Sequence, residues 1–490
     1  MISARLFDHS LYVAWQYPPH ERERWEGIVA LWALHGDGRR VQDGAMVAPE
    51  ERLNWFLTIG FGVQHVMVMF AATMLVPLLT GFPPTTTLFF SGLGTLLFLL
   101  ITRNRMPSYL GSSFAFLAPL TAAMQQNVPM AARVGAVLVA GALMLVIGIA
   151  VKALGARLLE SLMPPVVTGA VVIIIGLNLA RTAAQDFEKQ AGLAVPTFLV
   201  ILFVGVVLRG TLSRTAVLVG VLVGWLLAAF NGELDPIRLR DVLTAPWFGL
   251  PAFQTPEIRP ALVIAVLPAV VVLIAENVGH LKAVAAVTRR DLDGSAGDVL
   301  IGNGLATVLA GTGGGMGTTT YAENIGVMTA TRVYSTAAHV VAALVAILLS
   351  FSPKLGAMIN TVPPGVISGA SLMLYGMIGL VGIRIWLDAK IDLSDPVNLM
   401  VGGGALVAGI GNLTLSVGDV PLAGIAWGTI IIVVLHPLLR WLRGLTHGTA
   451  RTQAAGRNPR GREQAGREQA DREQQPGAGQ DQRGREQDGQ

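Results

Sequence analysis

Apolar stretches alternate with short polar breaks from about residue 53 to about residue 442 of the chain. A helix that crosses the hydrocarbon core of a bilayer needs about 20 predominantly apolar residues, and most of the stretches approach that length. We predict fourteen transmembrane segments, of which the third, ninth and tenth are short for a bilayer. The expected segments cover residues 53–79, 85–102, 108–126, 131–151, 165–181, 193–208, 214–230, 260–280, 298–311, 319–331, 335–350, 363–383, 397–412 and 420–440.

The composition also indicates a membrane protein. Hydrophobic residues make up 52% of the chain and charged residues only 13%, whereas a soluble domain carries about 25% charged residues. The absence of cysteine excludes disulfides, thiol catalysis and cysteine-ligated metals. The isoelectric point near 9.6 does not indicate nucleic-acid binding, because the basic residues lie in short loops between apolar segments, where membrane topology explains them.

The loop charges predict an orientation and the termini predict the domain limits. Arg and Lys are more frequent in the loops that lie inside when the N-terminus is cytoplasmic, so we expect both termini in the cytoplasm. Residues 1–50 lack the apolar core of a signal peptide and are expected to form a cytoplasmic segment. Residues 51–443 form the polytopic domain. Residues 446–490 repeat Arg-Glu-Gln with almost no apolar residues, which is typical of a disordered cytoplasmic tail.

Two of the short segments resemble each other. The third contains the sequence SYLGSSFAF at residues 108–116, and the tenth follows the run GTGGGMGTTTY at residues 311–321. Both are rich in Gly, Ser and Thr, and their odd spacing of seven segments gives them opposite orientations. Paired interrupted segments in two inverted halves indicate the binding site of a secondary transporter. The simpler alternative is that both are loops.

Ionisable residues within apolar segments are the strongest chemical signal, because burying a charge in a membrane is costly. Glu276, Glu323, His65 and His280 are such residues, and His280 shares a helix face with Glu276, four positions earlier. Each Glu could instead form an ion pair that only holds helices together. His339 has no comparable companion in the sequence, so we expect it to serve packing.

Two buried carboxylates have three possible uses: metal binding, proton relay, or acceptance of N–H groups from a ligand. No second carboxylate stands at chelating spacing beside either Glu, which argues against a metal. Relay and ligand binding are compatible, because a ligand's N–H donors favour the charged carboxylate while burial favours the neutral one. The sequence therefore predicts linked binding and protonation, with the proton as coupling ion and no other cofactor. No Ser/His/Asp or Cys/His constellation supports an enzyme.

Residues 323–332, ENIGVMTATR, match the signature Gln/Glu-Asn-x-Gly-x4-Thr-Arg of the nucleobase/ascorbate transporter family. The chain resembles the bacterial uracil and pyrimidine permeases of that family in three further blocks. These are QH at 64–65, GSSFAF at 111–116 and AENVGH at 275–280. The resemblance runs in register from about residue 50 to about residue 440.

The resemblance implies an all-α membrane fold of fourteen helices in two inverted seven-span repeats, with short extended segments of spans three and ten paired together. It implies a core domain at about 51–153 and 260–350, a gate domain at about 160–231 and 354–443, and a homodimer in the bacterial inner membrane. The residues that match substrate-binding positions are Glu276, Glu323, Phe114, Tyr321, Ala322 and Tyr375. Those that match proton-coupling positions are Glu276, His280 and His65, and the signature positions are Asn324, Gly326, Thr331 and Arg332.

The implied activity is proton-coupled import of uracil. Two departures, Asn277 in place of His and Ala322 in place of Gly, are compatible with thymine or another pyrimidine. The signature begins with Glu rather than Gln, which argues against a xanthine or urate carrier of the same family, although that alternative stays open. A further alternative is an anion exchanger or channel on the same fold, against which the two buried acids argue.

Overall fold

The computed structural model describes residues 32–41, 45–155, 164–417, 420–422 and 424–445. Helices occupy the predicted apolar segments, and proline sets the start of many of them. At the first position of a helix, proline loses no hydrogen bond and its φ angle is already helical. The long helices that begin in this way are α4 (Pro84–Ile101), α8 (Pro165–Lys189), α13 (Pro260–Thr288), α18 (Pro364–Asp388) and α19 (Pro396–Ile410).

The remaining predicted segments also contain helices. They are α3 (Trp55–Thr80), α6 (Met130–Leu154), α9 (Ala191–Val207), α11 (Ala216–Phe230), α14 (Ala296–Gly313), α16 (Thr336–Ser350) and α20 (Gly424–Ile430). Shorter helices α10 (Thr211–Arg214), α12 (Pro236–Thr244) and α17 (Pro353–Asn360) lie in the connections.

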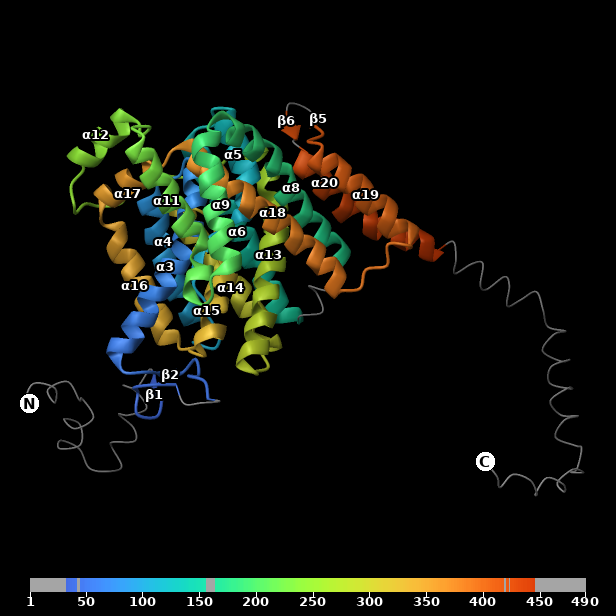
Figure 1. Cartoon of the computed structure of the whole chain (residues 1–490). Coiled ribbons are helices and arrows are strands. Elements are labelled where there is room, and N and C mark those ends of the chain that lie inside the picture. The colour runs from blue at the N-terminus through green and yellow to red at the C-terminus, as the bar shows by residue number, and fades with distance from the viewer. Residues whose placement is uncertain (1–31, 42–44, 156–163, 418–419, 423, 446–490) are drawn as a thin grey trace, which may run out of the picture. The chain divides into compact units, whose positions relative to one another are not determined.

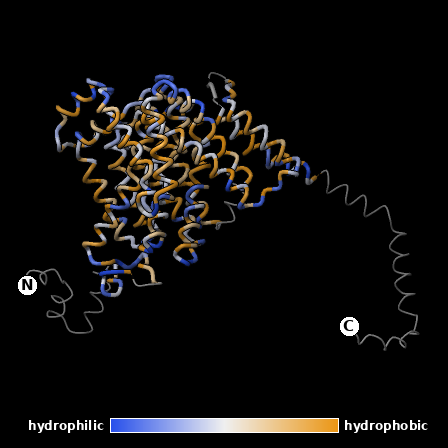
Figure 2. The backbone as a smooth tube through the Cα atoms, viewed as in Figure 1, coloured by the Kyte–Doolittle hydropathy of each residue, from blue (hydrophilic) through white to orange (hydrophobic). Residues whose placement is uncertain are grey.

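Helix length and hydropathy make this a multi-pass membrane protein. Seven helices in the described part of the chain are long and apolar enough to cross a membrane, or eight if the bent pair α16 and α17 forms one span. Hydrophobic residues follow the middle of the helices in Figure 2, and hydrophilic residues gather toward their ends. The fourteen-span count remains a prediction, because several of the other helices are shorter than a bilayer requires.

The third and tenth segments are interrupted helices, as the sequence predicts. The third consists of β3 (Leu110–Ser112), the 3-10 turn η1 (Phe114–Phe116) and α5 (Leu117–Gln125). The tenth consists of β4 (Thr318–Thr320) and α15 (Ala322–Thr331). The two strands pair in antiparallel fashion, with Gly111 opposite Thr319, which confirms the expected pairing and satisfies backbone groups that lipid could not.

Helices from the first half of the chain pack on helices from the second half. α6 packs on α14, and α16 packs on α4; α8 and α18 pack on each other. Glycine permits these close contacts. A Cβ atom at Gly304 of α14 would lie 2.6 Å from the backbone nitrogen of Leu145 in α6, and small residues at such positions let membrane helices approach.

An ordered segment precedes α3 and lies across one end of the helices (Figure 1). We call residues 32–41 and 45–54 the N-terminal strap. It contains β1 (Ala33–Leu34) and β2 (Glu51–Arg52), which pair in parallel. Val47 forms a β-bridge with Val333, which follows α15. The backbone N–H of Thr336, at the start of α16, donates to the Pro49 carbonyl at 3.0 Å.

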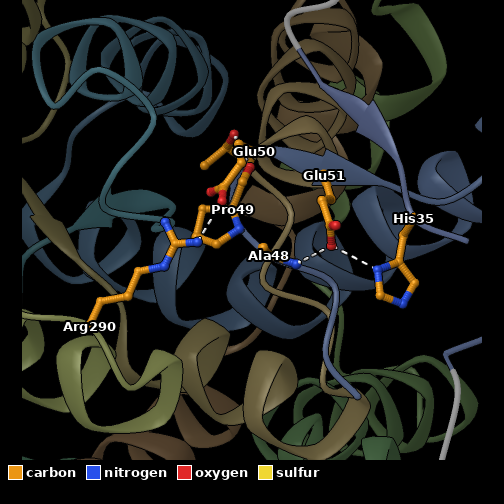
Figure 3. Close-up of polar contacts among 7 residues, drawn as sticks. His35, Ala48, Pro49, Glu50, Glu51 and Arg290 are labelled. Carbon is orange, nitrogen blue, oxygen red and sulfur yellow. Dashed lines mark hydrogen bonds and ion pairs between the residues drawn. The ribbon is translucent and has the colours of Figure 1, made fainter.

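Side chains fasten the strap to the ends of further helices. Arg290, just after α13, donates to Glu50 at 2.6 Å, and His35 lies 2.7 Å from Glu51 (Figure 3). The hydrogen bond from the Arg290 guanidinium lowers the pKa of the Glu50 carboxyl. Trp32 donates its indole N–H to the Thr336 hydroxyl at 2.7 Å. The strap therefore joins the ends of α13, α15 and α16, which the sequence analysis did not predict.

The chain divides into a large unit, Met1–Val433, and a second unit, Val434–Gln490. The described part of the second unit is helical and ends at Leu445. The predicted disordered tail at 446–490 lies outside the described residues.

Candidate functional site

The two carboxylates predicted from the sequence come together. Glu276 lies in the middle of α13, and Glu323 lies in the first turn of α15, immediately after β4. The two carboxyl groups are close enough to interact electrostatically with each other, and both interact with Tyr321. The break in the tenth segment thus places Glu323 opposite Glu276.

Neither carboxylate has a basic partner among the described residues. None of the ion pairs among the described residues includes Glu276 or Glu323, so the alternative of a purely structural ion pair fails. Both side chains keep accessible surface, and the neighbouring Ala322 is exposed, although Tyr321 and Asn324 around them are buried. An accessible carboxylate pair within an apolar bundle is a candidate ligand site.

The start of α15 supplies hydrogen-bond donors to the same space. Its N-cap residue, Tyr321, provides no side-chain cap, and the Glu323 carboxylate accepts from the backbone N–H of its own residue. N–H groups in the first turn that have no partner within the helix can bind a ligand. The positive end of the helix dipole also points there. The site therefore combines carboxylate acceptors with backbone donors, and the exposed Ala322 forms part of the N-terminal turn, as expected from the resemblance.

A hydrogen-bonded chain connects β4 to α13. The Thr320 hydroxyl donates to Asn277 Oδ1 at 3.1 Å, and His280 Nδ1 lies 2.8 Å from the same hydroxyl. Because the single hydroxyl proton goes to Asn277, His280 must donate from Nδ1. Its Nε2 is then the nitrogen that can accept a proton. Thr319 in turn forms a side-chain hydrogen bond with Glu276.

The other polar residues of β4 fix the strand to α14. Thr318 donates from its hydroxyl to Asn303 Oδ1 at 2.9 Å, and its backbone N–H donates to the Thr307 hydroxyl at 3.1 Å. Asn277 and the three threonines of β4 are not among the site residues predicted from the sequence. The run of threonines at 318–320, in a chain with few polar residues within its helices, is the signal that could have found them.

Tyr321 ties β4 to β3 and α3. Its hydroxyl donates to the Ser112 carbonyl at 2.8 Å and lies 3.3 Å from the Thr73 hydroxyl. Its ring covers Gly111, where a Cβ atom would overlap the aromatic carbons. Glycine is thus required in β3 at this point, because any side chain would displace Tyr321 from the site.

The remaining predicted residues lie at different distances from the carboxylates. Phe114 is partly buried where three hydrophobic clusters meet. Tyr375 of α18 is buried and forms a side-chain hydrogen bond with Ser371 of its own helix. Thr331 and Arg332 lie at the far end of α15, where Arg332 is exposed and its carbonyl accepts the Val47 N–H at 2.9 Å. The end of the signature therefore holds the strap.

Gly326 of the signature has a steric role. A Cβ atom there would overlap the guanidinium of Arg214, which ends α10. The bare glycine lets α10 approach α15.

His65 joins the site through the signature asparagine. Asn324 donates its amide N–H to His65 Nδ1 at 3.0 Å. His339, which we expect to serve packing, packs its ring against His65, with the centroids 4.4 Å apart and the ring planes tilted by 35°. Spacing could not reveal this pair, since the two residues are 274 positions apart in different helices.

A cavity of about 280 Å³ lies elsewhere, beside the turn between α3 and α4, and Arg238, Asp241 and Asn360 contribute to its lining. Since it contains none of the predicted site residues, we do not assign it to the candidate site. Among the described residues no group of three or more His, Asp or Glu side chains is arranged to hold a metal ion.

Comparison with known proteins decides the family. The model described as "Permease family" matches residues 57–418. The chain belongs to this permease family. The prediction of a carrier rather than an enzyme is therefore confirmed. The "Putative pyrimidine permease RutG" of Escherichia coli (strain K12) is 44% identical over 411 residues, which cover 81% of this chain and 92% of that protein.

Further relatives of the family are similar over almost their whole length. The "Uracil permease" of Escherichia coli (strain K12) is 38% identical and covers 80% of this chain and 94% of its own. The "Uracil permease" of Bacillus subtilis (strain 168) is 36% identical, and the match covers 78% of this chain and 93% of that protein.

Solved structures share the fold at low identity. The transmembrane domain of the cyanobacterial bicarbonate transporter BicA matches with a TM-score of 0.53 and 17% identity, over 78% of this chain and 98% of that one. SLC26A9 matches with a TM-score of 0.59 and 11% identity, over 79% of this chain and 65% of that one.

Proposed function

We propose that the protein imports uracil or a related pyrimidine nucleobase, such as thymine, together with a proton across the bacterial inner membrane. The observation that carries this proposal is the pair Glu276 and Glu323, two partly exposed carboxylates that interact electrostatically beside the start of α15. The names of the relatives, uracil and pyrimidine permeases, support the same substrate class.

The chemistry of the base fits the two kinds of group in the site. Uracil presents ring N–H donors and carbonyl acceptors on the same edges. Glu276 and Glu323 would accept from the N–H groups, while the backbone N–H groups of Ala322 and Phe114 would donate to the carbonyls. Tyr375 would border the base from the gate side. A site built from such pairs rejects analogues that lack the matching group.

Proton coupling would use Glu276 and His280, which β4 links through Thr319 and Thr320. A proton on Glu276 turns an acceptor into a donor and changes what the site can bind. One proton that crosses 100 mV contributes about 2.3 kcal/mol, which sustains about fifty-fold accumulation of substrate. His65, which the resemblance links to proton coupling, would support this pair through its hydrogen bond with Asn324.

Alternating access requires parts that move relative to each other. The exchange of partners between the halves, α6 on α14 and α16 on α4, is the pattern that an inverted repeat produces. We assign α3 to α6 and α13 to α16 to a core domain, and α8 to α11 and α18 to α20 to a gate domain. Fourteen spans, a homodimer and cytoplasmic termini complete the proposal.

An anion exchanger is the second candidate, since the structures that share the fold include a bicarbonate transporter. Two acidic side chains without a basic partner disfavour an anion at the same place. A xanthine or urate carrier of the same family is distinguished by competition experiments.

Uptake into proteoliposomes tests the proposal. Labelled uracil should accumulate when the outside is made acidic, and Glu276→Gln or Glu323→Gln should abolish accumulation. Glu233→Gln is a matched control, because Glu233 is exposed and its side chain accepts from the nearby Asn231 side chain at 3.1 Å. Excess thymine should compete with uracil, whereas xanthine, urate and bicarbonate should not. Accumulation of urate or bicarbonate without uracil uptake would refute the proposed substrate.

A further inference from the structure

A second buried polar cluster lies beside the candidate site and is not used by the proposed substrate contacts. It consists of His65 on α3, Asn324 on α15 and His339 on α16. None of the three residues is more than 1% exposed. The imidazole rings contact each other with their centroids 4.4 Å apart and their planes tilted by 35°, and the Asn324 amide contacts His65.

The hydrogen bonds determine which ring nitrogens carry protons. Asn324 Nδ2 lies 3.0 Å from His65 Nδ1 and 3.3 Å from the His65 carbonyl oxygen. Since the carbonyl can only accept, the amide nitrogen is the donor to both atoms, and His65 Nδ1 is an acceptor. The neutral His65 ring therefore holds its proton on Nε2.

His339 has the opposite arrangement. Its Nδ1 lies 3.1 Å from the Ser335 carbonyl oxygen, one helical turn earlier. That oxygen can only accept, so Nδ1 carries the proton and Nε2 presents a lone pair. This Nε2 atom is buried and has no hydrogen-bond partner.

Two further polar atoms of the same region are also buried without a partner, namely Asn324 Oδ1 and Ser335 Oγ. Unsatisfied buried groups are uncommon in native proteins and call for an explanation, such as an internal water or a proton that binds during function. Three such atoms on α15, on α16 and at its N-cap indicate a place where a proton binds rather than a packing defect.

We propose that His339 is a second proton-binding residue of the transport cycle. The inference rests on the proposed proton symport and names a residue and a route within it. A proton adds to the lone pair of His339 Nε2, which forms an imidazolium while the Nδ1–H bond to Ser335 stays in place. Release of that proton to water restores the neutral ring. His65 is a positioning residue here, because Asn324 already occupies its free lone pair.

The cluster lies near both the substrate site and the strap. Asn324 follows Glu323 directly, so the cluster and the substrate site share the first turn of α15. Ser335 precedes α16 at the strap, where Thr336 bonds to Pro49. His339 therefore lies one helical turn into α16 from the end of the helices that we assign to the cytoplasm.

The surroundings leave His65 as the titratable group that faces His339. α16 packs on α3, α4, β2 and α17. Apart from His65, α3 has no titratable residue, and α4 has none. The charged groups of the other two elements interact elsewhere: Glu51 with His35, Arg52 with the Trp55 ring, and Lys354 with the Trp247 ring.

The experiment compares gradient-driven accumulation with equilibrium exchange of labelled and unlabelled uracil in proteoliposomes. The variants are His339→Phe, which keeps a ring against His65, and His339→Gln, which keeps a polar group. Ser350→Ala is the control on the same helix, since its buried hydroxyl bonds only to the Ile347 carbonyl of its own turn. One unit of pH gradient drives about tenfold accumulation per coupled proton.

We expect both His339 variants to exchange uracil within about twofold of the wild-type rate and to lose the tenfold accumulation, while Ser350→Ala retains both. Normal accumulation by His339→Phe would overturn the inference and leave the proposed function intact. Loss of exchange together with accumulation in both variants would also overturn it, because His339 would then only hold the helices together. A wild-type protein that exchanges uracil but ignores the gradient would refute proton coupling itself, and the inference with it.

Discussion

Replacing Thr320 with valine tests the hydrogen-bonded chain at the centre of the site. Valine has the same shape as threonine but lacks the hydroxyl, so the change removes two contacts and leaves the packing almost unaltered. The hydroxyl accepts from His280 Nδ1 at 2.8 Å and donates to Asn277 Oδ1 at 3.1 Å. Both partners lose a hydrogen bond at once.

The cost follows from these contacts. A hydrogen bond between membrane helices contributes about 0.6 kcal/mol on average, and each buried group left without a partner costs about 1 kcal/mol more at the lower end of the usual range. The free energy of unfolding of Thr320→Val should therefore fall by roughly 3 kcal/mol. Thr320→Ser keeps the hydroxyl and should recover most of that loss.

The chain offers a matched control in Thr87 of α4. This residue is 2% exposed, and its hydroxyl is buried without a hydrogen-bond partner. Thr87→Val should leave the free energy of unfolding unchanged or raise it by up to about 1 kcal/mol, because the hydroxyl costs desolvation and gains nothing. Unfolding in mixed detergent micelles measures all three variants. Equal losses for Thr320→Val and Thr87→Val would refute the reasoning, since the hydroxyl of Thr320 would then contribute nothing specific.

Three further predictions concern the glycine contact between α14 and α6, the strap, and the Tyr321 ring that covers Gly111 of β3. Gly304→Ala should lower the free energy of unfolding by about 1–3 kcal/mol by forcing α14 away from α6, whereas Gly403→Ala, which meets no atom within 4 Å, should not. The Glu50→Gln variant should melt at a lower temperature than the wild type above pH 4.5, and the difference should vanish as the pH falls further, because Arg290 lowers the pKa of folded Glu50 and its contribution is lost on protonation; a difference that persists in acid would contradict this. Tyr321→Phe removes a 2.8 Å hydrogen bond and should raise the KM for uracil about fivefold, with unchanged KM as the contrary result in an uptake assay.

The sequence predicts the helices well because the physical signals are local. A run of about 20 apolar residues has few alternatives to a membrane helix, and proline marks where α8, α13 and α18 begin. The interruption in the tenth segment was also visible, since glycine and threonine are poor helix formers. The strap was not, because its strands are two residues long and depend on contacts with residues near 333 and 290.

The candidate site divides in the same way. A buried carboxylate is conspicuous in any apolar segment, and so Glu276 and Glu323 were found directly. Asn277, Thr320 and His339 gain their importance from partners in other helices, which spacing along one chain does not reveal. His65 and His339 show this most clearly, since each nitrogen acquires its role from a neighbour contributed by α15 or α16.

The break between β4 and α15 explains why binding and protonation would be linked at one place. An intact helix at residues 318–331 would bond its own backbone groups and leave no free N–H groups for a ligand. The break removes these helical hydrogen bonds. The strand that replaces the first turn is then held by the side chains of its threonines. Because Thr319 contacts Glu276 and Thr320 contacts His280, any shift of β4 when a base binds at the start of α15 would alter both ionisable groups together. Under the proposed function, the element that binds the substrate is therefore the element that sets the proton affinity of the site.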